Sequence, residues 1–399
     1  MKFKKLTYVL IAAMMVTMLA SCGKKEEPVV EVEVVTPTPE PTAIPTPEAT
    51  PTPEPTPTPE GMVRSYLTGK FVPEEIGRRR PIAVMLNNVK VAVPQAGIAN
   101  ADVIYEAPVE GGITRLMGIF EDYDNLEKIG SMRSCRDYYI FYASGFDAIY
   151  VHFGQSVYAL GILDLPQVNN LSGLAGYSGS VFYRTSDRQA PHNAYTSYEG
   201  IQKGIEICEY TQEYREGYQS SYIFAADDKP VELKGDWKAT VVEPGYLLND
   251  ARFEFNEEDG QYYRFQYGDK QIDELTGEQL KYDNIIIQYS TWRNYDENGY
   301  LNIDVDAANR GVYITNGKAI PITWMKHEPW GATYYHDEDG KQIKLNQGKT
   351  WVCIVQDTME DQVSIGDGVT SGNPDASAQT PAATEETNLI APEIITADE

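Results

Sequence analysis

Residues 101–122, ADVIYEAPVEGGITRLMGIFED, determine how the middle of the chain can fold. Two apolar-rich runs flank Gly111-Gly112, and a glycine pair of this kind forms the two-residue loop of a β-hairpin because glycine accepts positive φ angles. Such a loop predicts that Glu106 lies opposite Met117. Because Pro108 cannot donate a backbone hydrogen bond, we expect its strand to lie at a sheet edge or to break its pairing there.

This pairing gives the hairpin one charged face and one apolar face. Since side chains alternate along a strand, Glu106, Glu110 and Arg115 fall on the same face, with the arginine diagonal to both carboxylates. The long guanidinium fork reaches either of them. The residues expected on the other face, toward the core, are Val103, Tyr105, Val109, Leu116 and Phe120.

The segments around the hairpin predict a mixed α/β part. Short apolar runs at 81–87 (PIAVMLN) and 146–154 (FDAIYVHFG) are typical of buried strands. Helices are predicted within 135–145 (CRDYYIFYASG) and 196–214 (TSYEGIQKGIEICEYTQEY). In the second of these, Thr196 begins a capping box that marks the start of the helix.

The second half of the sequence predicts a series of short strands. From about residue 229 to residue 356, the turn sequences NEEDGQ, DENGY, TNGKA, DEDGK and NQGKT separate apolar runs such as NIIIQYS and WVCIVQ. Turns of Asn, Asp and Gly at this spacing favour antiparallel pairing. The chain is therefore predicted to be α+β, with a mixed α/β N-terminal part and a β-rich, mostly antiparallel C-terminal part.

Shifts in composition divide the chain into five parts. Lysines, a short apolar run and the sequence LASC ending at Cys22 are typical of a bacterial lipoprotein signal, in which Cys22 is lipidated. The Pro/Thr/Glu repeats that follow favour an extended stalk, and the acidic C-terminal end is expected to be disordered. The predicted parts are a signal peptide at 1–22, a stalk at 23–62, an N-terminal domain at 63–228, a C-terminal domain at 229–365 and an acidic tail at 366–399.

These features predict an extracytoplasmic protein attached to a bacterial membrane by a lipid anchor, and they do not decide between an inner and an outer membrane. The formal net charge of −26 argues against nucleic acid as a partner. The sequence has no P-loop or Rossmann glycine pattern and no close His or Cys pair, so neither a cofactor nor a metal site is predicted. A Cys208–Cys353 disulfide stays open, but three cysteines beyond Cys22 do not make a disulfide framework.

Basic side chains gather in two further segments, and His152 lies at the end of the strand predicted within 146–154. GSMRSCRDYY (130–139) leads into a helix, whose backbone N–H groups and two guanidinium forks suit a carboxylate or phosphate. RTSDRQAPHN (184–193) is a loop without apolar periodicity, where structural demand alone explains little. The candidate ligand-binding residues are Arg115, Arg133, Arg136, His152, Arg188, His192 and Asn193.

Three uses of these residues stay open, so whether the protein is an enzyme is undecided. The first is a buried salt-bridge network, in which Glu106 and Glu110 only hold arginines. The second is a pocket for an anionic or sugar-containing envelope ligand or for a partner protein. The third is catalysis, with Glu106 and Glu110 as an acid/base pair for a glycan. Alternatively, Cys135 is a nucleophile whose pKa the neighbouring arginines lower, with His152 or His192 as its base.

Many segments of the chain resemble the YerB family of bacterial lipoproteins, whose two-part domain has no known function. They are RPIAVMLNN, PQAGIANADVIYEAPVEGGITRLMGIFED, IGSMRSCRDYYI, FDAIYVHFG, RQAPHNAYTS, TNGKAIPITWMK and TYYHDEDGKQIKLNQGKTWVCIV. The resemblance implies an extracytoplasmic lipidated protein and no particular reaction, and Cys135 stands where the family has a small residue. The chain also resembles, more loosely, the LytR-CpsA-Psr phosphotransferases, which place an Asp on one strand and arginines after the next strand. This similarity implies envelope phosphotransfer as the alternative function.

Overall fold

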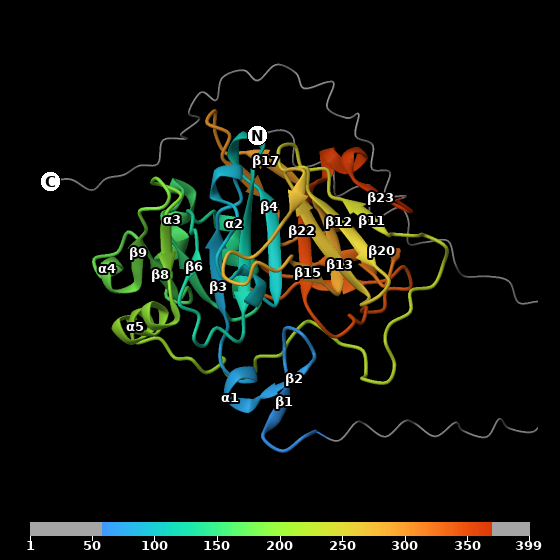
Figure 1. The fold of residues 1–399 in the computed structure, drawn as a ribbon, viewed down its shortest axis with the longest axis horizontal. Helices are drawn as coiled ribbons and strands as arrows, with labels where there is room; N and C mark the ends of the chain where they lie inside the picture. Colours follow the sequence, from blue (N-terminus) through green and yellow to red (C-terminus); the bar gives the residue numbers. More distant parts are fainter. Residues whose placement is uncertain (1–57, 369–399) are drawn as a thin grey trace, which may run out of the picture. The chain divides into compact units, whose positions relative to one another are not determined.

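The computed structural model describes residues 58–368, and the predictions for the signal peptide, Cys22, most of the stalk and most of the acidic tail lie outside these residues. A ten-stranded sheet with the order β21-β20-β19-β16-β22-β4-β5-β3-β7-β8 is the centre of the fold (Figure 1). Its strands are β3 (Ile82–Leu86), β4 (Val103–Pro108), β5 (Thr114–Phe120), β7 (Ile149–His152), β8 (Asn170–Ser172), β16 (Asn284–Ser290), β19 (Ala308–Thr315), β20 (Lys318–Met325), β21 (Tyr334–His336) and β22 (Thr350–Gln356).

Both halves of the sequence contribute to this sheet, and they join where β22 pairs with β4. β22 is parallel to β16 on one side and to β4 on the other. β3, β7 and β8 are also parallel to one another, and β5 runs antiparallel between β4 and β3. As a result β16, β22, β4, β3, β7 and β8 all end on the same side of the sheet, which we call the carboxyl edge.

The central strands form because they are apolar on both faces, as buried strands of parallel sheets are. Every residue of β3 and of β16 is buried. Successive residues then serve two separate cores, so that Tyr105 of β4 packs in one core and Ile104 in the other. The sheet is therefore the middle layer of three.

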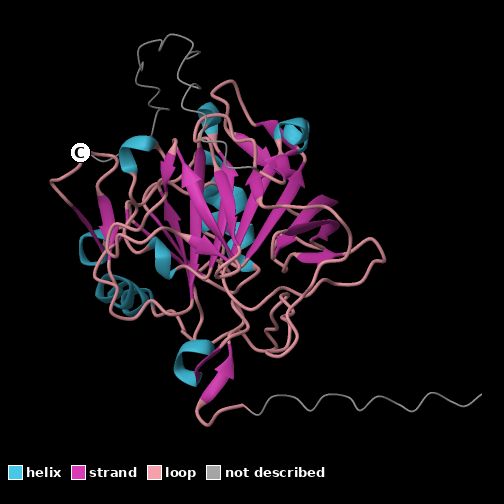
Figure 2. Cartoon of the chain, turned by 45° about the vertical axis from the view of Figure 1, so that its right-hand side comes forward, coloured by secondary structure: helices cyan, strands magenta, loops and turns pink. Residues whose placement is uncertain are grey.

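One face of the large sheet is covered by helices and the other mainly by a second sheet (Figure 2). Helices α2 (Asp137–Ser144) and α3 (Val157–Leu163) lie on the first face, where the rings of Tyr105 and Tyr142 stack at 4.9 Å. On the second face, Phe253 packs edge-on against Trp351. The second sheet is antiparallel and contains β11 (Val241–Glu243), β12 (Arg252–Asn256), β13 (Gln261–Gln266), β14 (Asp269–Lys270), β15 (Lys281–Tyr282) and β23 (Ser364–Gly366).

Shorter elements complete the described part of the chain. Within residues 58–368, no helix is long and apolar enough to cross a membrane. These elements are β1 (Met62–Arg64), β2 (Phe71–Pro73), β6 (Ile129–Gly130), β9 (Phe182–Arg184), β10 (Ala194–Thr196), β17 (Trp292–Asn294), β18 (Leu301–Ile303), α1 (Glu74–Gly77), α4 (Ser178–Val181), α5 (Tyr198–Cys208), η1 (Lys90–Ala92), η2 (Ile98–Asn100), η3 (Glu110–Gly112) and η4 (Asp357–Gln362).

The α+β class is confirmed, with a mixed N-terminal part and mostly antiparallel strands in the C-terminal part. Both predicted helices are present as α2 and α5. The predicted cap of α5 is wrong by one residue: the Ser197 side chain, rather than that of Thr196, accepts a hydrogen bond from the Gly200 backbone N–H. The predicted boundary near residue 228 stays a prediction.

The register of the β4–β5 hairpin differs from the prediction. Glu106 lies opposite Leu116, and Arg115 lies opposite Ala107. The connection is longer than two residues because it contains the turn η3, closed by a hydrogen bond from Val109 N to Ile113 O at 2.9 Å. A shift of one residue exchanges the two faces of a strand. The prediction that Glu106 and Arg115 share a face is therefore wrong.

Pro108 ends β4 but does not place it at an edge. β4 is a central strand, between β22 and β5. Its pairing with β22 stops at Glu106, two residues before the proline, whereas its pairing with β5 continues to Pro108. Of the two predicted outcomes, a sheet edge or a break in the pairing, the second is observed, on the side that faces β22. Pro108 has no backbone N–H to donate to that strand.

Candidate functional site

The candidate site lies at the carboxyl edge of the large sheet. In sheets with parallel strands, ligands bind preferentially outside the carboxyl ends of the strands, where loops converge. Here the segment 131–136, which connects β6 to α2, crosses this edge next to the end of β3. The Asn87 N–H donates to Ser131 O at 2.8 Å, and the Arg133 N–H donates to Met85 O at 3.1 Å. The backbone of this segment is therefore fixed to the end of β3.

Three arginines lie close together here: Arg133 and Arg136 belong to the segment, and Arg115 of β5 lies beside it. The side chain of Arg115 donates from Nη1 to Ser134 O at 2.5 Å and is 3% exposed. Its pKa is lowered to about 9, mainly by burial and then by the nearby charges of Arg136 and Arg133. Among residues 58–368, no carboxylate lies within ion-pair distance of Arg115. This guanidinium is thus buried beside two other cations.

One carboxylate, that of Glu110, forms an ion pair within this group of arginines. Glu110 holds Arg136 with two parallel bonds, Nε to Oε1 at 2.7 Å and Nη2 to Oε2 at 2.6 Å. Burial opposes ionisation of Glu110, but the ion pair outweighs it and lowers the pKa. Burial raises the pKa of Asp137, which accepts a hydrogen bond from the Tyr295 hydroxyl at 2.5 Å. The ring of Tyr300 covers the Arg136 guanidinium at 5.3 Å.

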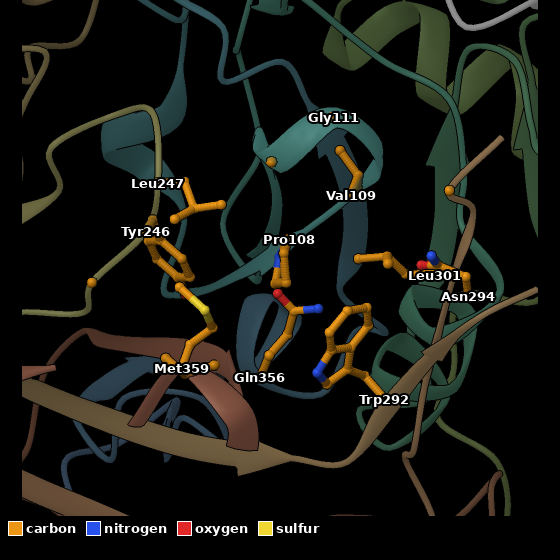
Figure 3. A pocket seen from close by; sticks show the side chains of 14 residues that line it. Pro108, Val109, Gly111, Tyr246, Leu247, Trp292, Asn294, Leu301, Gln356 and Met359 are labelled. Carbon is orange, nitrogen blue, oxygen red and sulfur yellow. The ribbon is translucent and has the colours of Figure 1, made fainter. Parts of the chain in front are cut away.

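A cavity of about 280 Å³ lies beside the turn that contains Glu110 (Figure 3). None of its lining residues is charged. Trp292 and Asn294 come from the C-terminal part, and the Trp292 indole N–H donates to Thr358 Oγ1 at 2.9 Å, which fixes the ring. The lining residues are Pro108, Val109, Gly111, Gly112, Gly245, Tyr246, Leu247, Trp292, Asn294, Gly299, Leu301, Val355, Gln356 and Met359.

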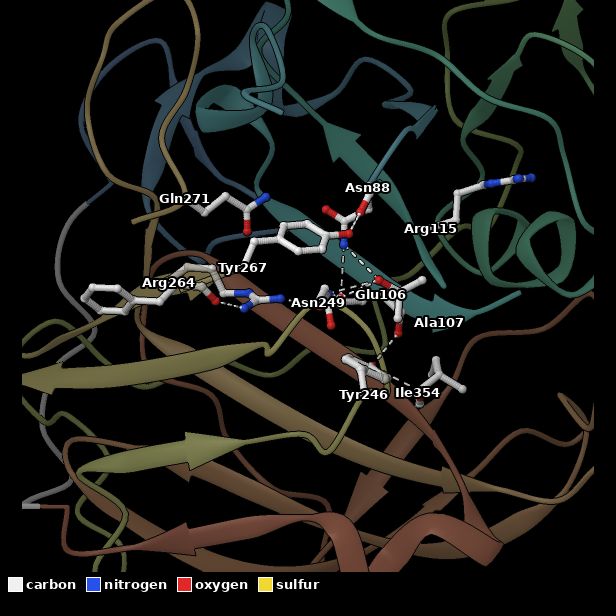
Figure 4. Close-up of polar contacts among 12 residues, drawn as sticks. Asn88, Glu106, Ala107, Arg115, Tyr246, Asn249, Arg264, Tyr267, Gln271 and Ile354 are labelled. Carbon is white, nitrogen blue, oxygen red and sulfur yellow. Dashed lines mark hydrogen bonds and ion pairs between the residues drawn. The ribbon is translucent and has the colours of Figure 1, made fainter. Parts of the chain in front are cut away.

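Glu106 belongs to a separate, fully buried network (Figure 4). Its Oε2 lies 2.8 Å from Nη2 of Arg264, and both side chains are 0% exposed. Its Oε1 accepts hydrogen bonds from Asn249 Nδ2 and Thr114 Oγ1, each at 2.8 Å, and from Asn88 Nδ2 at 3.2 Å. Figure 4 shows Arg115 directed away from this network. The network joins β4 to β13 of the second sheet.

The two histidines have different surroundings. His152 is fully buried, with Nδ1 2.8 Å from Gly154 O and Nε2 3.2 Å from the Asn170 side chain, and burial lowers its pKa. His192 is half-buried and its Nδ1 lies 2.9 Å from Nδ2 of Asn87. The structure thus brings His192, but not the ring of the buried His152, to the accessible side of the carboxyl edge.

Arg188 and Asn193 support loops. Arg188 donates to the carbonyl groups of Ala92 and Pro94 at 2.9 and 2.8 Å and forms an ion pair with Glu274 at 3.1 Å. Asn193 donates to Thr185 O at 2.7 Å and accepts from Arg184 at 2.8 Å. Both side chains are thus engaged with loop segments and with Glu274 or Arg184.

The cysteines do not have the chemistry that their neighbours in the sequence indicate. Cys135 is 0% exposed, and burial raises its pKa to about 12. The predicted lowering of its pKa is therefore wrong, because desolvation of the thiolate outweighs the nearby arginines. Cys208 and Cys353 are both free, so the disulfide that was left open does not form. Among residues 58–368, no group of three His, Cys, Asp or Glu side chains could hold a metal ion.

Comparison with known proteins identifies the family. A family model described as "Protein of unknown function (DUF3048) N-terminal domain" matches residues 67–211, and the corresponding C-terminal domain model matches residues 242–352. The chain belongs to this two-part, YerB-like family. "Putative lipoprotein YerB" from Bacillus subtilis (strain 168) is 30% identical over 307 residues, which cover 77% of this chain and 90% of that protein. The resemblance seen in the sequence is confirmed.

A solved structure from the YerB-like family shows the same fold. The crystal structure of YerB protein from Bacillus subtilis matches with a TM-score of 0.65 at 30% identity, and the match covers 76% of this chain and 100% of that one. The relatives' names state no ligand and no reaction. The chemistry of the YerB-like site must therefore be argued from this chain.

Several site residues of this YerB-like chain were missed in the sequence. Arg264 is the clearest, because the alternation in QYYRFQ places it on the inward face of its strand, where a charge requires a partner. No local pattern links it to Glu106, which is far away in the sequence. No sequence pattern indicated Trp292 and Asn294 as site residues, because they reach the cavity only through the pairing of β17 with β18.

Proposed function

We propose that this YerB-like protein is a lipid-anchored binding protein on the extracytoplasmic face of a bacterial membrane, and that its carboxyl edge holds an anionic, sugar-containing ligand of the cell envelope. The signal sequence ending at Cys22 and the name of the B. subtilis relative support the anchor. The arginines support the anionic group, and the adjacent cavity supports the sugar.

The observation that carries the proposal is the burial of Arg115 without a carboxylate of its own among the described residues. A buried charge is costly unless it is paired. Glu110, which lies close enough to influence Arg115, is already bound to Arg136 through both oxygens. An anion bound at this edge supplies the missing negative charge. The arginine group is a local positive region in a chain whose formal net charge is −26.

The adjacent cavity has the composition of a site for a neutral ring. Ligand pockets are mostly apolar, with a few polar groups that set orientation. Here Trp292 offers an aromatic surface, and the side-chain amides of Asn294 and Gln356 can each donate to and accept from hydroxyl groups. Gly111 and Gly112 line the cavity next to Glu110, so the turn η3 connects it to the arginines.

For the two glutamates, the same geometry favours a role in binding over acid/base catalysis. Glu106 is completely buried and bound to Arg264, and Glu110 is bound to Arg136. A general acid or base must reach the reacting atoms directly or through one water molecule. Neither carboxylate meets this requirement while its arginine is in place.

The test measures binding of the full chain, in detergent, to immobilised anionic and neutral envelope polysaccharides. Arg133→Gln is the informative variant because Arg133 is the half-buried member of the arginine group. We expect it to weaken binding of the anionic polysaccharide about tenfold or more, as loss of a charge-assisted hydrogen bond does. Lys234→Gln, which removes an exposed positive charge elsewhere, is the matched control. Equal binding by both variants, or no preference for the anionic polysaccharide, would contradict the proposal.

A further inference from the structure

A second cavity, of about 560 Å³, lies at the opposite end of the large sheet. It is bordered by residues that precede the strands: Arg78 before β3 and Lys344 before β22. Figure 1 shows α1, β1 and β2 below the sheet, whereas β17 of the candidate site lies above it. The lining residues are Arg64, Ser65, Tyr66, Gly69, Arg78, Gln219, Ser220, Tyr222, Ile223, Phe224, Ala225, Ala226 and Lys344.

The charged groups that line this cavity are all positive. Arg64, Arg78 and Lys344 contribute to the lining, and no aspartate or glutamate does. Arg64 has a counter-charge at the rim, since its guanidinium is bound to Asp227 at 2.5 and 2.8 Å. Three cations around one opening are unusual for a chain with 59 acidic and 33 basic residues. Their arrangement attracts an anion locally.

Arg78 is placed to bind such an anion. It donates from Nη1 to Arg64 O at 3.1 Å and to Gly77 O at 2.7 Å, and it has no ion pair within residues 58–368. Its guanidinium lies over the ring of Tyr66, 4.6 Å from the centroid. Stacking and the two carbonyl bonds orient the planar fork while leaving other N–H groups for a ligand.

The aromatic side chains beside these cations form a wall in which the rings pack against one another. The ring of Tyr66 contacts Tyr214 and Tyr218 edge-on, with centroids 5.4 and 5.5 Å apart, and those two rings stack on each other at 4.5 Å. Tyr222 and Phe224 form another part of the wall, in an edge-on contact at 6.2 Å. Such preorganised aromatic surfaces bind the flat face of a ring at low entropic cost.

Hydroxyl and amide groups complete the lining. Ser220 Oγ donates to Tyr66 O at 2.9 Å and accepts from the Tyr222 N–H at 3.1 Å, so it fixes the segment that carries the aromatic wall. Gln219 adds an exposed side-chain amide. A ring with hydroxyl groups and an attached dianion matches this combination of aromatic faces, polar groups and cations.

We propose that this cavity is a second ligand site, distinct from the carboxyl edge, and that it takes a phosphate-bearing sugar. Arg78 and Lys344 hold the phosphate, and Tyr66 and Phe224 contact the sugar ring. The inference does not rest on the function proposed for the carboxyl edge, because the two sites share no lining residue.

The test is a calorimetric titration of the full chain, in detergent, with glucose 1-phosphate, inorganic phosphate and glucose as separate probes. We expect saturable binding of glucose 1-phosphate, about tenfold tighter than that of inorganic phosphate, because the ring adds contacts with the aromatic wall. Arg78→Gln and Lys344→Gln should each weaken it about tenfold. The surface control Lys234→Gln, which lines neither cavity, should leave it unchanged.

Each alternative outcome overturns a defined part of the proposal. Equal affinity for inorganic phosphate and glucose 1-phosphate would refute the sugar, and equal affinity for glucose and its phosphate would refute the cation site. Lys344 is exposed, so its variant keeps the test valid if Arg78→Gln fails to fold. Binding that is lost only in Arg133→Gln would move the ligand to the carboxyl edge and refute the second site.

Discussion

Replacing Glu106 by glutamine tests whether the buried network between the two sheets stabilises the fold. The substitution keeps the shape and the Oε1 acceptor, but it removes the charge that faces Arg264 and directs an amide donor at its Nη2. Both side chains are 0% exposed, so no water can replace the lost partner. Removing one partner of a buried ion pair costs about 3–5 kcal/mol. We expect a loss of that size in the free energy of unfolding.

The matched control is Glu254→Gln, on β12, the neighbour of the strand β13 that carries Arg264. Glu254 pairs with Arg252 at the same N–O distance, 2.8 Å, but these side chains are 27% and 31% exposed. Exposed pairs contribute about 1 kcal/mol or less. Urea unfolding can be followed by tryptophan fluorescence, because the Arg264 guanidinium lies 4.8 Å from the ring of Trp351. A loss in Glu106→Gln no larger than in the control would refute the structural role.

Three further predictions concern pH, thiol reactivity and helix packing. Burial raises the pKa of Glu121 to about 7, so the folded state keeps a proton that the unfolded state loses near pH 4.5. The free energy of unfolding should therefore fall by about 3 kcal/mol as the pH rises from about 4.5 to 8. Urea unfolding at both pH values should show a smaller fall in Glu121→Gln. In a Cys22→Ser chain, the half-buried Cys208 should react with a thiol reagent well before the buried Cys135; equal rates would contradict the burial described. Gly200→Ala should destabilise α5 because the new Cβ would lie 2.3 Å from Val181 O. Gly161→Ala in α3 meets no atom within 4 Å and should stabilise the protein by about 0.5–1 kcal/mol. The melting temperature should therefore fall in the first variant and rise in the second.

The sequence predicted individual elements well where one local pattern determines them. The apolar runs at 81–87 and 146–154 became β3 and β7, and turn sequences such as NEEDGQ and TNGKA separate antiparallel strands. The register of the β4–β5 hairpin failed because a Gly-Gly pair fits several loop lengths, and only the complete sheet selects one of them. The wrong register then put Glu106 and Arg115 on a common face.

The candidate site could be predicted only in part. The arginines around segment 131–136 are close in sequence to the elements that hold them, and the basic pattern indicated them correctly as neighbours. The counterparts from the C-terminal part, Arg264 of the network and Trp292 of the cavity, reach the site through strand pairings formed over long distances in the sequence. The reactivity of Cys135 was misjudged because burial, which sequence neighbours do not report, dominates its pKa.

The seam between β4 and β22 has a consequence for folding. The partner of β4 on one side is β22, which comes much later in the sequence, so until β22 is in place that side of β4 has unpaired backbone groups. Pairings between segments so remote form slowly. We therefore expect a chain in which β22 is not yet in place to be prone to aggregation through the open side of β4.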